Sequence, residues 1–358
     1  MDKEKISLLL SKGPCIIEDN ELKILSLNDI KIIKDPIEFE KRMDDPNYFL
    51  PNDRMILINN SGRISRRIPS LKISTKIPNK TKLNNLISDK YEIAEQLFLK
   101  QSELPNLICN IPNDETSILI VVDGLSFHDA KKYFECKPVF VDGPSLTRNG
   151  ILRIIGKPTI AERLYNKGIR KIFGYSYWSR EEKPNITGFA FSPIPPENLF
   201  VFEHFSEVID DLYNKNINNS YIQIFISGLD EICHKFRDFP PIESIIKSIK
   251  LKFESIYSLC KEKEIRSSIL LTSDHGILWK KDNEFEIIKD FGLVEGGPRW
   301  TKGKILRNTT LNFNGEDSKI TSLKYPYITK KIRRNEWGVH GGISYEESIV
   351  PLISRVVC

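Results

Sequence analysis

Acidic and imidazole side chains in this 358-residue chain recur at points where runs of apolar residues stop. One such run, residues 268–273, ends at Asp274, His275 and Gly276. A continuous, partly β-branched run of this length is typical of a buried parallel strand. An aspartate and a histidine at the end of such a strand could both bind one cation, or they could belong to a solvated turn. Similar residues after other apolar runs favour the cation site.

Three more segments carry the same side-chain types. Asp123 follows the apolar run Ile118–Val122. Asp230 and His234 are four residues apart, a spacing that places both on one face of a helical turn. His340 precedes two glycines near the carboxyl terminus. Taken singly, these residues are typical of a turn, a surface ion pair and a tight loop, but together they indicate one common metal site.

The histidine count supports this interpretation, because the chain has only five histidines and three of them lie in these segments. Of the other two, His128 lies close in sequence to Asp123 and could support the site without binding a cation. His204 is typical of an ordinary, partly buried histidine. Neither is included in the predicted ligand set.

Thr147 is a further candidate site residue. It lies in the segment Gly143–Gly150, immediately before apolar residues that could form a helix. A hydroxyl at the amino terminus of a helix is close to unpaired backbone N–H groups and to the positive end of the helix dipole, which suits a phosphoryl group. The alternative is a threonine that only caps the helix.

The order of predicted elements defines the fold class. Strand patterns alternate with helix patterns, which predicts an α/β fold with a mostly parallel central sheet flanked by helices. In such sheets, ligands bind at the carboxyl ends of the strands. The predicted strands are 117–122, 138–141, 169–175, 221–226 and 268–273, and the predicted helices are 158–167, 205–214 and about twenty residues from Ile242. A last apolar segment follows at 348–357.

The first part of the chain differs from the rest. Residues 1–115 are predicted to form a small α+β accessory region, and residues 116–358 the main domain. Short strand-like runs occur at 15–17 and 55–58, and residues 90–100 have a helical pattern. The polar residues 79–85 are predicted to be a loop. This region offers no histidine, so the chemistry is predicted to lie in the main domain.

Composition indicates a cytoplasmic globular protein. The chain is 40% hydrophobic and 28% charged, which is ordinary for such proteins. No run approaches the roughly 20 apolar residues needed to span a bilayer. The amino terminus lacks the apolar core of a signal peptide. The six cysteines show no CxxC pair, which is typical of free thiols in a reducing compartment.

The order Asp, Thr, Asp-x-x-x-His, Asp-His, His resembles that of the alkaline phosphatase superfamily of two-metal phosphoryl-transfer enzymes. The sequence is most similar to the PglZ domain, which occurs in bacterial phage-defence systems and in some response regulators. The resemblance covers residues 117–358 and not the first hundred or so. The residues that carry it are Val122–Gly124, Pro144–Thr147, Asp230–His234, Thr272–Gly276 and Trp337–Leu352.

This resemblance implies two divalent cations, for which zinc suits the carboxylate and imidazole ligands best and manganese is the alternative. It also implies that Thr147 attacks the substrate and forms a phosphothreonine, which water then hydrolyses. Residues 147–150 do not fit the sulfatase motif Cys/Ser-x-Pro-x-Arg, so sulfate esters are not expected. The implied ligands are Asp123, Thr147, Asp274 and His275 for one cation, and Asp230, His234 and His340 for the other.

Charge distribution indicates a polyanionic substrate. The net charge is +5, but residues 63–82 hold seven Lys or Arg and no acid, and residues 299–334 hold ten Lys or Arg and two acids. The second segment also contains Trp300, Tyr325 and Tyr327, with Trp337 just beyond it. Cations for phosphates and aromatic faces for bases are how single-stranded nucleic acid is bound. The alternative is that the cations lie in solvated loops and the aromatic residues pack against the sheet.

Three functions follow from these observations. The first is hydrolysis of nucleotide or oligonucleotide phosphodiesters, in phage defence or signalling. The second is a phosphomonoesterase or phosphotransferase acting on a small metabolite. The third is a non-catalytic scaffold in a defence complex with other proteins, which the complete ligand set disfavours.

Overall fold

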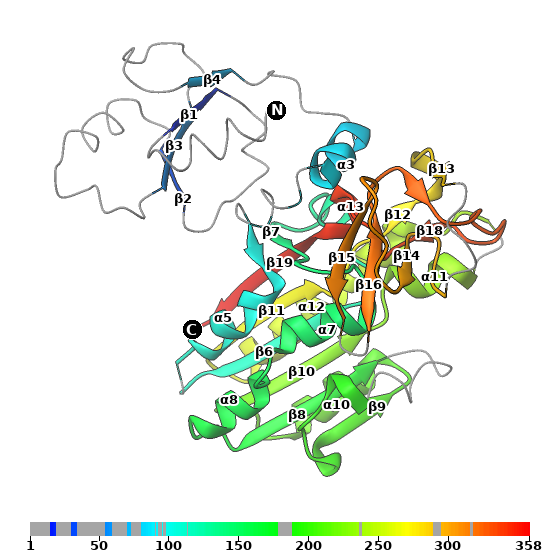
Figure 1. Cartoon of the computed structure of the whole chain (residues 1–358). Coiled ribbons are helices and arrows are strands. Elements are labelled where there is room, and N and C mark those ends of the chain that lie inside the picture. The colour runs from blue at the N-terminus through cyan, green and yellow to red at the C-terminus, as the bar shows by residue number, and fades with distance from the viewer. Residues whose placement is uncertain are drawn as a thin grey trace. The chain divides into compact units, whose positions relative to one another are not determined.

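A computed structural model describes residues 15–18, 30–33, 54–58, 70–72, 80–89, 91, 95, 98–112, 114–177, 188–235, 238–288, 295–315 and 318–358. The chain divides into two compact units, residues 1–99 and residues 100–358. The elements of both units are labelled in Figure 1. In the part of the chain described, no helix combines the length and the apolar character needed to cross a bilayer.

The first unit contains a four-stranded sheet of order β2-β3-β1-β4. Strand β1 pairs in parallel with β3 and β4, and β2 pairs in parallel with β3. The predicted strands at 15–17 and 55–58 are present as β1 and β3. The bounds are β1 Cys15–Glu18, β2 Ile30–Ile33, β3 Arg54–Ile58 and β4 Ser70–Lys72.

Near the end of this unit, one local prediction was wrong and a second is confirmed only in part. Helix α3, Lys80–Asp89, occupies the segment expected to be a polar loop. Its buried residues Asn84, Ile87 and Ser88 lie three and four positions apart and so share one helix face. Two of these three are polar, which hides the face from a hydrophobicity pattern. The helix expected at 90–100 lies partly outside the described residues. Of the residues described, Tyr91 and Glu95 are helical, whereas the last two form strand β5, Leu99–Lys100.

The second unit is built on an eight-stranded sheet of order β5-β7-β19-β11-β6-β10-β8-β9. Strands β11, β6, β10, β8 and β9 run parallel to one another. Strand β19 runs antiparallel to β11 and β7. The predicted α/β fold with a mostly parallel sheet is therefore confirmed. The bounds are β6 Thr116–Val122, β7 Lys137–Phe140, β8 Lys171–Tyr177, β9 Leu199–Phe202, β10 Ser220–Ile226, β11 Ser267–Ser273 and β19 Ile349–Val357.

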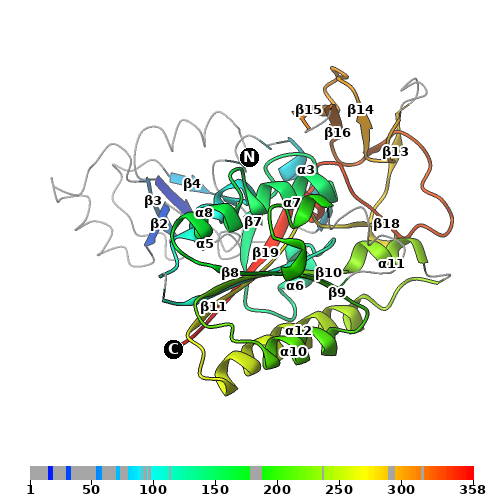
Figure 2. The same cartoon turned by 90° about the horizontal axis from the view of Figure 1, so that it is seen from below.

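Helices cover both faces of this sheet. Figure 2 shows α7 and α8 on one face and α10 and α12 on the other. Because both faces are covered, β6 is buried along its whole length, which explains its unbroken apolar sequence. The bounds are α5 Leu104–Cys109, α6 Phe127–Ala130, α7 Thr147–Ile155, α8 Ile160–Asn166, α10 Phe205–Asn214, α11 Leu229–Lys235, α12 Ile242–Glu262 and α13 Tyr345–Ser348, with short 3-10 helices at Gln101–Glu103, Pro196–Asn198 and Lys280–Asp282.

Alternate residues of β6 pack toward α10 and α12. Ile118, Ile120 and Val122 belong to a core cluster that also contains Phe253 and Ile256 of α12. These five side chains are at most 1% exposed. The burial of this face anchors the strands whose ends carry the predicted ligands.

A small antiparallel sheet was not predicted from the sequence. Strands β14, β16 and β15 form it, in that order, between the main-sheet strands β11 and β19 along the chain. Two short ladders, β12 with β18 and β13 with β17, lie in the same stretch. The bounds are β12 Leu278–Trp279, β13 Glu286–Ile287, β14 Trp300–Lys302, β15 Thr310–Asn314, β16 Lys319–Leu323, β17 Tyr327–Ile328 and β18 Gly338–Val339.

Candidate metal centre

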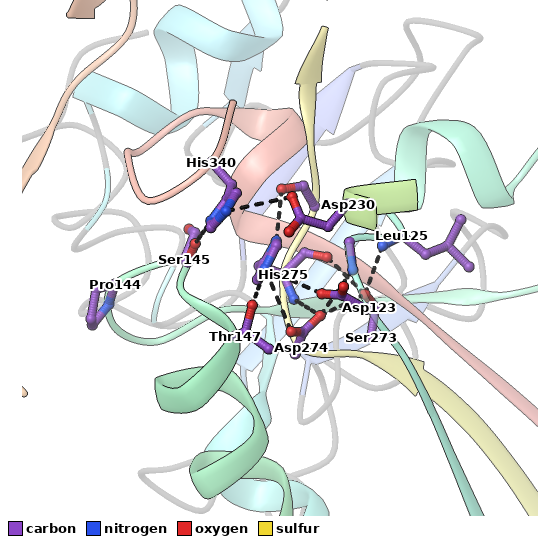
Figure 3. A network of polar contacts seen from close by, with 12 residues as sticks. Asp123, Leu125, Pro144, Ser145, Thr147, Asp230, Ser273, Asp274, His275 and His340 are labelled. Atoms are coloured by element: carbon purple, nitrogen blue, oxygen red, sulfur yellow. Dashed lines mark hydrogen bonds and ion pairs between the residues drawn. The ribbon is translucent and has the colours of Figure 1, made fainter. Parts of the chain in front are cut away.

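The register of three strands brings the predicted acids together. Val122 of β6 pairs with Ile226 of β10 on one side and with Ser273 of β11 on the other. The residues that follow these three therefore leave the sheet at the same level. Asp123 and Asp274 follow directly, and Figure 3 shows both close to Asp230, which belongs to the helix after β10.

His275 is the centre of the first ligand group. Its Nε2 lies 3.5 Å from Asp274 Oδ2 and 3.7 Å from Asp123 Oδ1. It also lies 3.1 Å from Thr147 Oγ1. Its Nδ1 faces the Gly276 carbonyl at 3.2 Å, and a proton donated there leaves Nε2 free to bind a cation. The structure thus places all four residues predicted for one cation around a single point.

His340 and Asp230 form the second group. His340 Nε2 lies 3.5 Å from Asp230 Oδ1, and His340 Nδ1 lies 3.0 Å from the Ser145 carbonyl. The rings of His340 and His275 stack with centroids 4.2 Å apart, so the two groups adjoin. His234 is also predicted to belong here, but its side chain lies outside the described residues, so its role stays a prediction.

The first group fits a divalent cation. Asp274 Oδ1 accepts hydrogen bonds from the backbone N–H groups of Gly124 (3.0 Å) and His275 (2.8 Å). Asp274 Oδ2 is buried and has no hydrogen-bond partner in the described part of the chain. A buried carboxylate oxygen without a donor is costly unless a positive charge is near. Carboxylate oxygens of Asp123 and Asp274 and a nitrogen of His275 lie within 4.8 Å of one another, and this donor set suits zinc or manganese.

Thr147 is the first residue of α7. Leu146, the residue before it, makes no side-chain cap. The first backbone N–H groups of a helix have no acceptor within the helix, so this end of α7 favours negative charge. The helix also approaches the ligands closely, because a Cβ on Gly150 would lie 2.2 Å from the Asp274 carbonyl oxygen. Glycine at this position lets the helix bring Thr147 to His275.

Two supporting residues were missed in the sequence. The buried Gln101 donates through Nε2 to the carbonyls of Ser273 (2.8 Å) and Asp274 (2.7 Å). Its Oε1 accepts from Arg153 Nε at 3.1 Å, and Arg153 Nη2 donates to the Pro144 carbonyl at 2.9 Å. The pair therefore ties the end of β11 to the segment that carries Thr147. No local pattern identifies Gln101, which is 173 positions from Asp274.

The other two histidines lie elsewhere. The ring of His128 packs edge-to-face against Tyr345, with centroids 6.2 Å apart. His204 is exposed at the amino terminus of α10, where its backbone N–H donates to Glu207 Oε2. The prediction of a partly buried His204 was therefore wrong.

The two site histidines differ in their affinity for protons. Burial disfavours charge on His275 and lowers its pKa, although the Asp274 carboxylate acts in the opposite direction. Burial also disfavours charge on His340, but the Asp230 carboxylate and the Ser145 carbonyl outweigh it and raise the pKa of His340. In the metal-free protein, His340 is therefore the imidazole that binds a proton first as the pH falls.

This difference predicts two pH dependences for metal binding. A proton on His340 competes with the cation, so the second cation should be lost at a higher pH than the first. Below the His340 pKa, its affinity should fall about tenfold for each pH unit. Titrations of the metal-free protein with Zn²⁺ between pH 5 and 8 measure both affinities. Loss of both cations in a single step would contradict the assignment.

Comparisons with known proteins do not name a family for this chain. No family model and no curated protein match the sequence. The PglZ resemblance therefore stays a prediction.

Three solved structures with a similar arrangement of elements have names that refer to phosphoester chemistry. Mouse ectonucleotide pyrophosphatase/phosphodiesterase 5 is 11% identical with a TM-score of 0.45, over 67% of this chain and 88% of that one. The periplasmic domain of phosphoethanolamine transferase EptC from Campylobacter jejuni is 11% identical with a TM-score of 0.35, over 72% and 83%. TAB5 alkaline phosphatase is 11% identical with a TM-score of 0.30, over 67% and 90%. Because these values are low, we infer the function from the site itself.

Proposed function

We propose that this protein is a divalent-metal-dependent phosphodiesterase with Thr147 as its nucleophile. The observation that supports this most strongly is the convergence of Thr147, Asp123, Asp274 and His275 around one buried point at the amino terminus of α7. A hydroxyl, two carboxylates and an imidazole can hold a cation beside a phosphoryl group. A helix terminus favours the charge of that group.

The residues assigned to the cations follow the two groups. Bound cations, with zinc preferred over manganese, would neutralise phosphoryl oxygens and make a coordinated hydroxyl or water a better nucleophile. Asp123, Thr147, Asp274 and His275 are proposed to hold the first cation. Asp230, His234 and His340 are proposed to hold the second.

The residues of the chain then act in order. Thr147 Oγ1 attacks phosphorus and forms a P–O bond as the bond to the leaving alcohol breaks. The Asp274 carboxylate, held by two backbone N–H groups, keeps its other oxygen directed into the site. The first turn of α7 stabilises the phosphoryl charge. Water then attacks the phosphorus of this threonine-linked phosphodiester and breaks its bond to Thr147 Oγ1, which releases a phosphate monoester and restores Thr147.

We propose nucleotides or oligonucleotides as substrates. The segment 299–334 supports this in part, because eight of its cationic side chains are exposed. The first residues of the segment lie beside the site, since a Cβ on Gly341, next to His340, would lie 2.3 Å from Trp300 Cδ1. The segment differs from the expectation at Arg299 and Tyr325, which are buried and so are not available to bind nucleic acid. The exposed cations are Lys302, Lys304, Arg307, Lys319, Lys330, Lys331, Arg333 and Arg334.

The biological setting rests on the PglZ resemblance and on composition. Composition favours a cytoplasmic protein, and the resemblance favours an enzyme that acts in phage defence or signalling, in part with other defence proteins. The alternative activity is a phosphomonoesterase or phosphotransferase on a small metabolite. A non-catalytic scaffold would not need a buried carboxylate oxygen without a hydrogen-bond donor, such as Asp274 Oδ2 in the described part of the chain.

One assay distinguishes these functions. Metal-free protein should hydrolyse bis-p-nitrophenyl phosphate about 100-fold or more slowly than protein supplied with Zn²⁺ or Mn²⁺, because the cation provides most of the charge stabilisation. A short oligonucleotide should be cleaved under the same conditions. Faster turnover of p-nitrophenyl phosphate than of the diester would favour the monoesterase. Protein that takes up neither metal would favour the scaffold.

A further inference from the structure

A buried ion pair lies behind the second ligand group. The side chains of Arg299 and Glu347 are both 0% exposed. Arg299 Nη2 lies 2.6 Å from Glu347 Oε2, and Arg299 Nε donates to Glu347 Oε1 at 3.1 Å. This bidentate geometry fixes the planes of both groups. Since two charges are costly to bury, such a pair needs further hydrogen bonds to be stable.

Those further bonds go to the loop that follows His340. The Gly342 N–H donates to Glu347 Oε1 at 2.9 Å, and Arg299 Nη2 donates to the Ile343 carbonyl at 3.3 Å. A Cβ on Gly342 would lie 2.5 Å from Arg299 Nε, so the loop is packed directly on the guanidinium. The ion pair therefore holds residues two and three positions after His340.

The same pair reaches the other ligand group and the small sheet. The Glu347 carbonyl accepts from the Gly276 N–H at 3.1 Å, next to His275. Arg299 Nη1 donates to the Lys324 carbonyl at 3.1 Å, just after β16. On the opposite side of the loop, Ser145 Oγ donates to the Gly342 carbonyl at 3.0 Å. The His340 loop is thus held between the ion pair and the segment that carries Thr147.

We propose that Arg299 and Glu347 are a positioning pair for His340, which they hold in the orientation required to bind the second cation. The proposal rests on the metal centre of the proposed function. Neither side chain touches the reacting atoms. Arg299 also joins the small sheet β14–β16 to the metal centre, which explains why the residue directly before β14 is a buried arginine and not an exposed cation.

Metal binding tests the proposal without an activity assay. Arg299→Lys keeps the charge but cannot form the bidentate pair. Substitution of a residue that orients a metal-binding histidine typically lowers metal affinity by about 10- to 100-fold. We therefore expect Arg299→Lys to weaken the second Mn²⁺ or Zn²⁺ by that factor and to leave the first nearly unchanged. Titrations with these metals, monitored by equilibrium dialysis and by Mn²⁺ electron paramagnetic resonance, measure both affinities.

Three controls separate positioning from general destabilisation. Arg355→Lys alters an exposed pair with Glu254 and should leave both affinities unchanged. Arg299→Met combined with Glu347→Leu removes both charges and leaves none unpaired, so this variant should fold and still lose the second cation selectively. In a His340→Ala background, Arg299→Lys should have no further effect on the second cation, because a double-mutant cycle reports coupling through His340.

The outcomes are distinguishable. Suppose that the wild type binds two cations, and that Arg299→Lys and the Arg299→Met, Glu347→Leu double variant bind them with wild-type affinity. This result overturns the positioning pair and leaves the proposed function intact. Equal weakening of both cations in folded variants also overturns it, because the pair would then act on the whole fold. Wild-type protein that binds no cation overturns the proposed function and this pair with it.

Discussion

Thr147→Ala should lower kcat for phosphodiester hydrolysis on the order of 10³-fold or more, since removal of a nucleophile abolishes the covalent route. Thr147 Oγ1 lies 3.1 Å from His275 Nε2 and in the first turn of α7, which is the position from which the proposed attack is made. The first cation should remain bound, because Asp123, Asp274 and His275 are unchanged. Steady-state kinetics on bis-p-nitrophenyl phosphate and metal analysis of the same sample measure the two quantities.

Thr147→Ser is the matched variant. It keeps the hydroxyl and loses one methyl group, so it should retain most of the activity. Acid quenching during turnover should trap a phosphoryl group that still carries the remaining p-nitrophenyl ester. Mass spectrometry should find it on Thr147 in the wild type, on the introduced serine in this variant, and on neither in Thr147→Ala. Full activity of Thr147→Ala would show that water attacks the substrate directly and that Thr147 is not the nucleophile.

Asp274→Asn should remove the first cation and, with it, most of the activity. The change keeps the shape of the side chain but removes the negative charge and leaves one oxygen where two were. The remaining side-chain oxygen must accept hydrogen bonds from the N–H groups of Gly124 and His275. The amide NH2 group then faces His275 Nε2, where the wild type has a carboxylate oxygen, and it is a hydrogen-bond donor. We expect at least about a 100-fold loss of affinity for that cation, more than for a residue that only orients a ligand.

The control for this variant is Asp210→Asn, which removes an exposed acid on α10, on the opposite face of the sheet from α7. It should bind metal and hydrolyse diesters as the wild type does. Asp274→Asn removes the charge of a carboxylate whose buried Oδ2 has no hydrogen-bond donor in the described part of the chain, so thermal unfolding of the metal-free variant should show no loss of stability. An Asp274→Asn protein that binds two cations and retains full activity would show that the cation is held elsewhere.

Much of the fold and of the site could be read from short stretches of sequence. Strand β6 is covered on both faces, and such burial requires the continuous apolar run that identifies it. The acids after β6 and β11 could be placed together because parallel strands end at one edge of a sheet, and the register of Val122 with Ser273 confirms that step. The helix at 80–89 could not be predicted, because Asn84 and Ser88 occupy its buried face.

The sequence by itself determined the α/β fold class, because burial of whole strands leaves a recognisable apolar pattern. It also offered candidate metal ligands, of which the structure groups Asp123, Asp274 and His275. Only the tertiary structure decided that β19 runs antiparallel, that Gln101 holds the end of β11, and that Arg299 is buried against Glu347. Arg299 and Glu347 are 48 positions apart, and in the sequence Arg299 begins a basic segment typical of solvated cations. A polar side chain acquires its role from the partner that the topology places beside it, and the pattern of its own neighbours does not contain that partner.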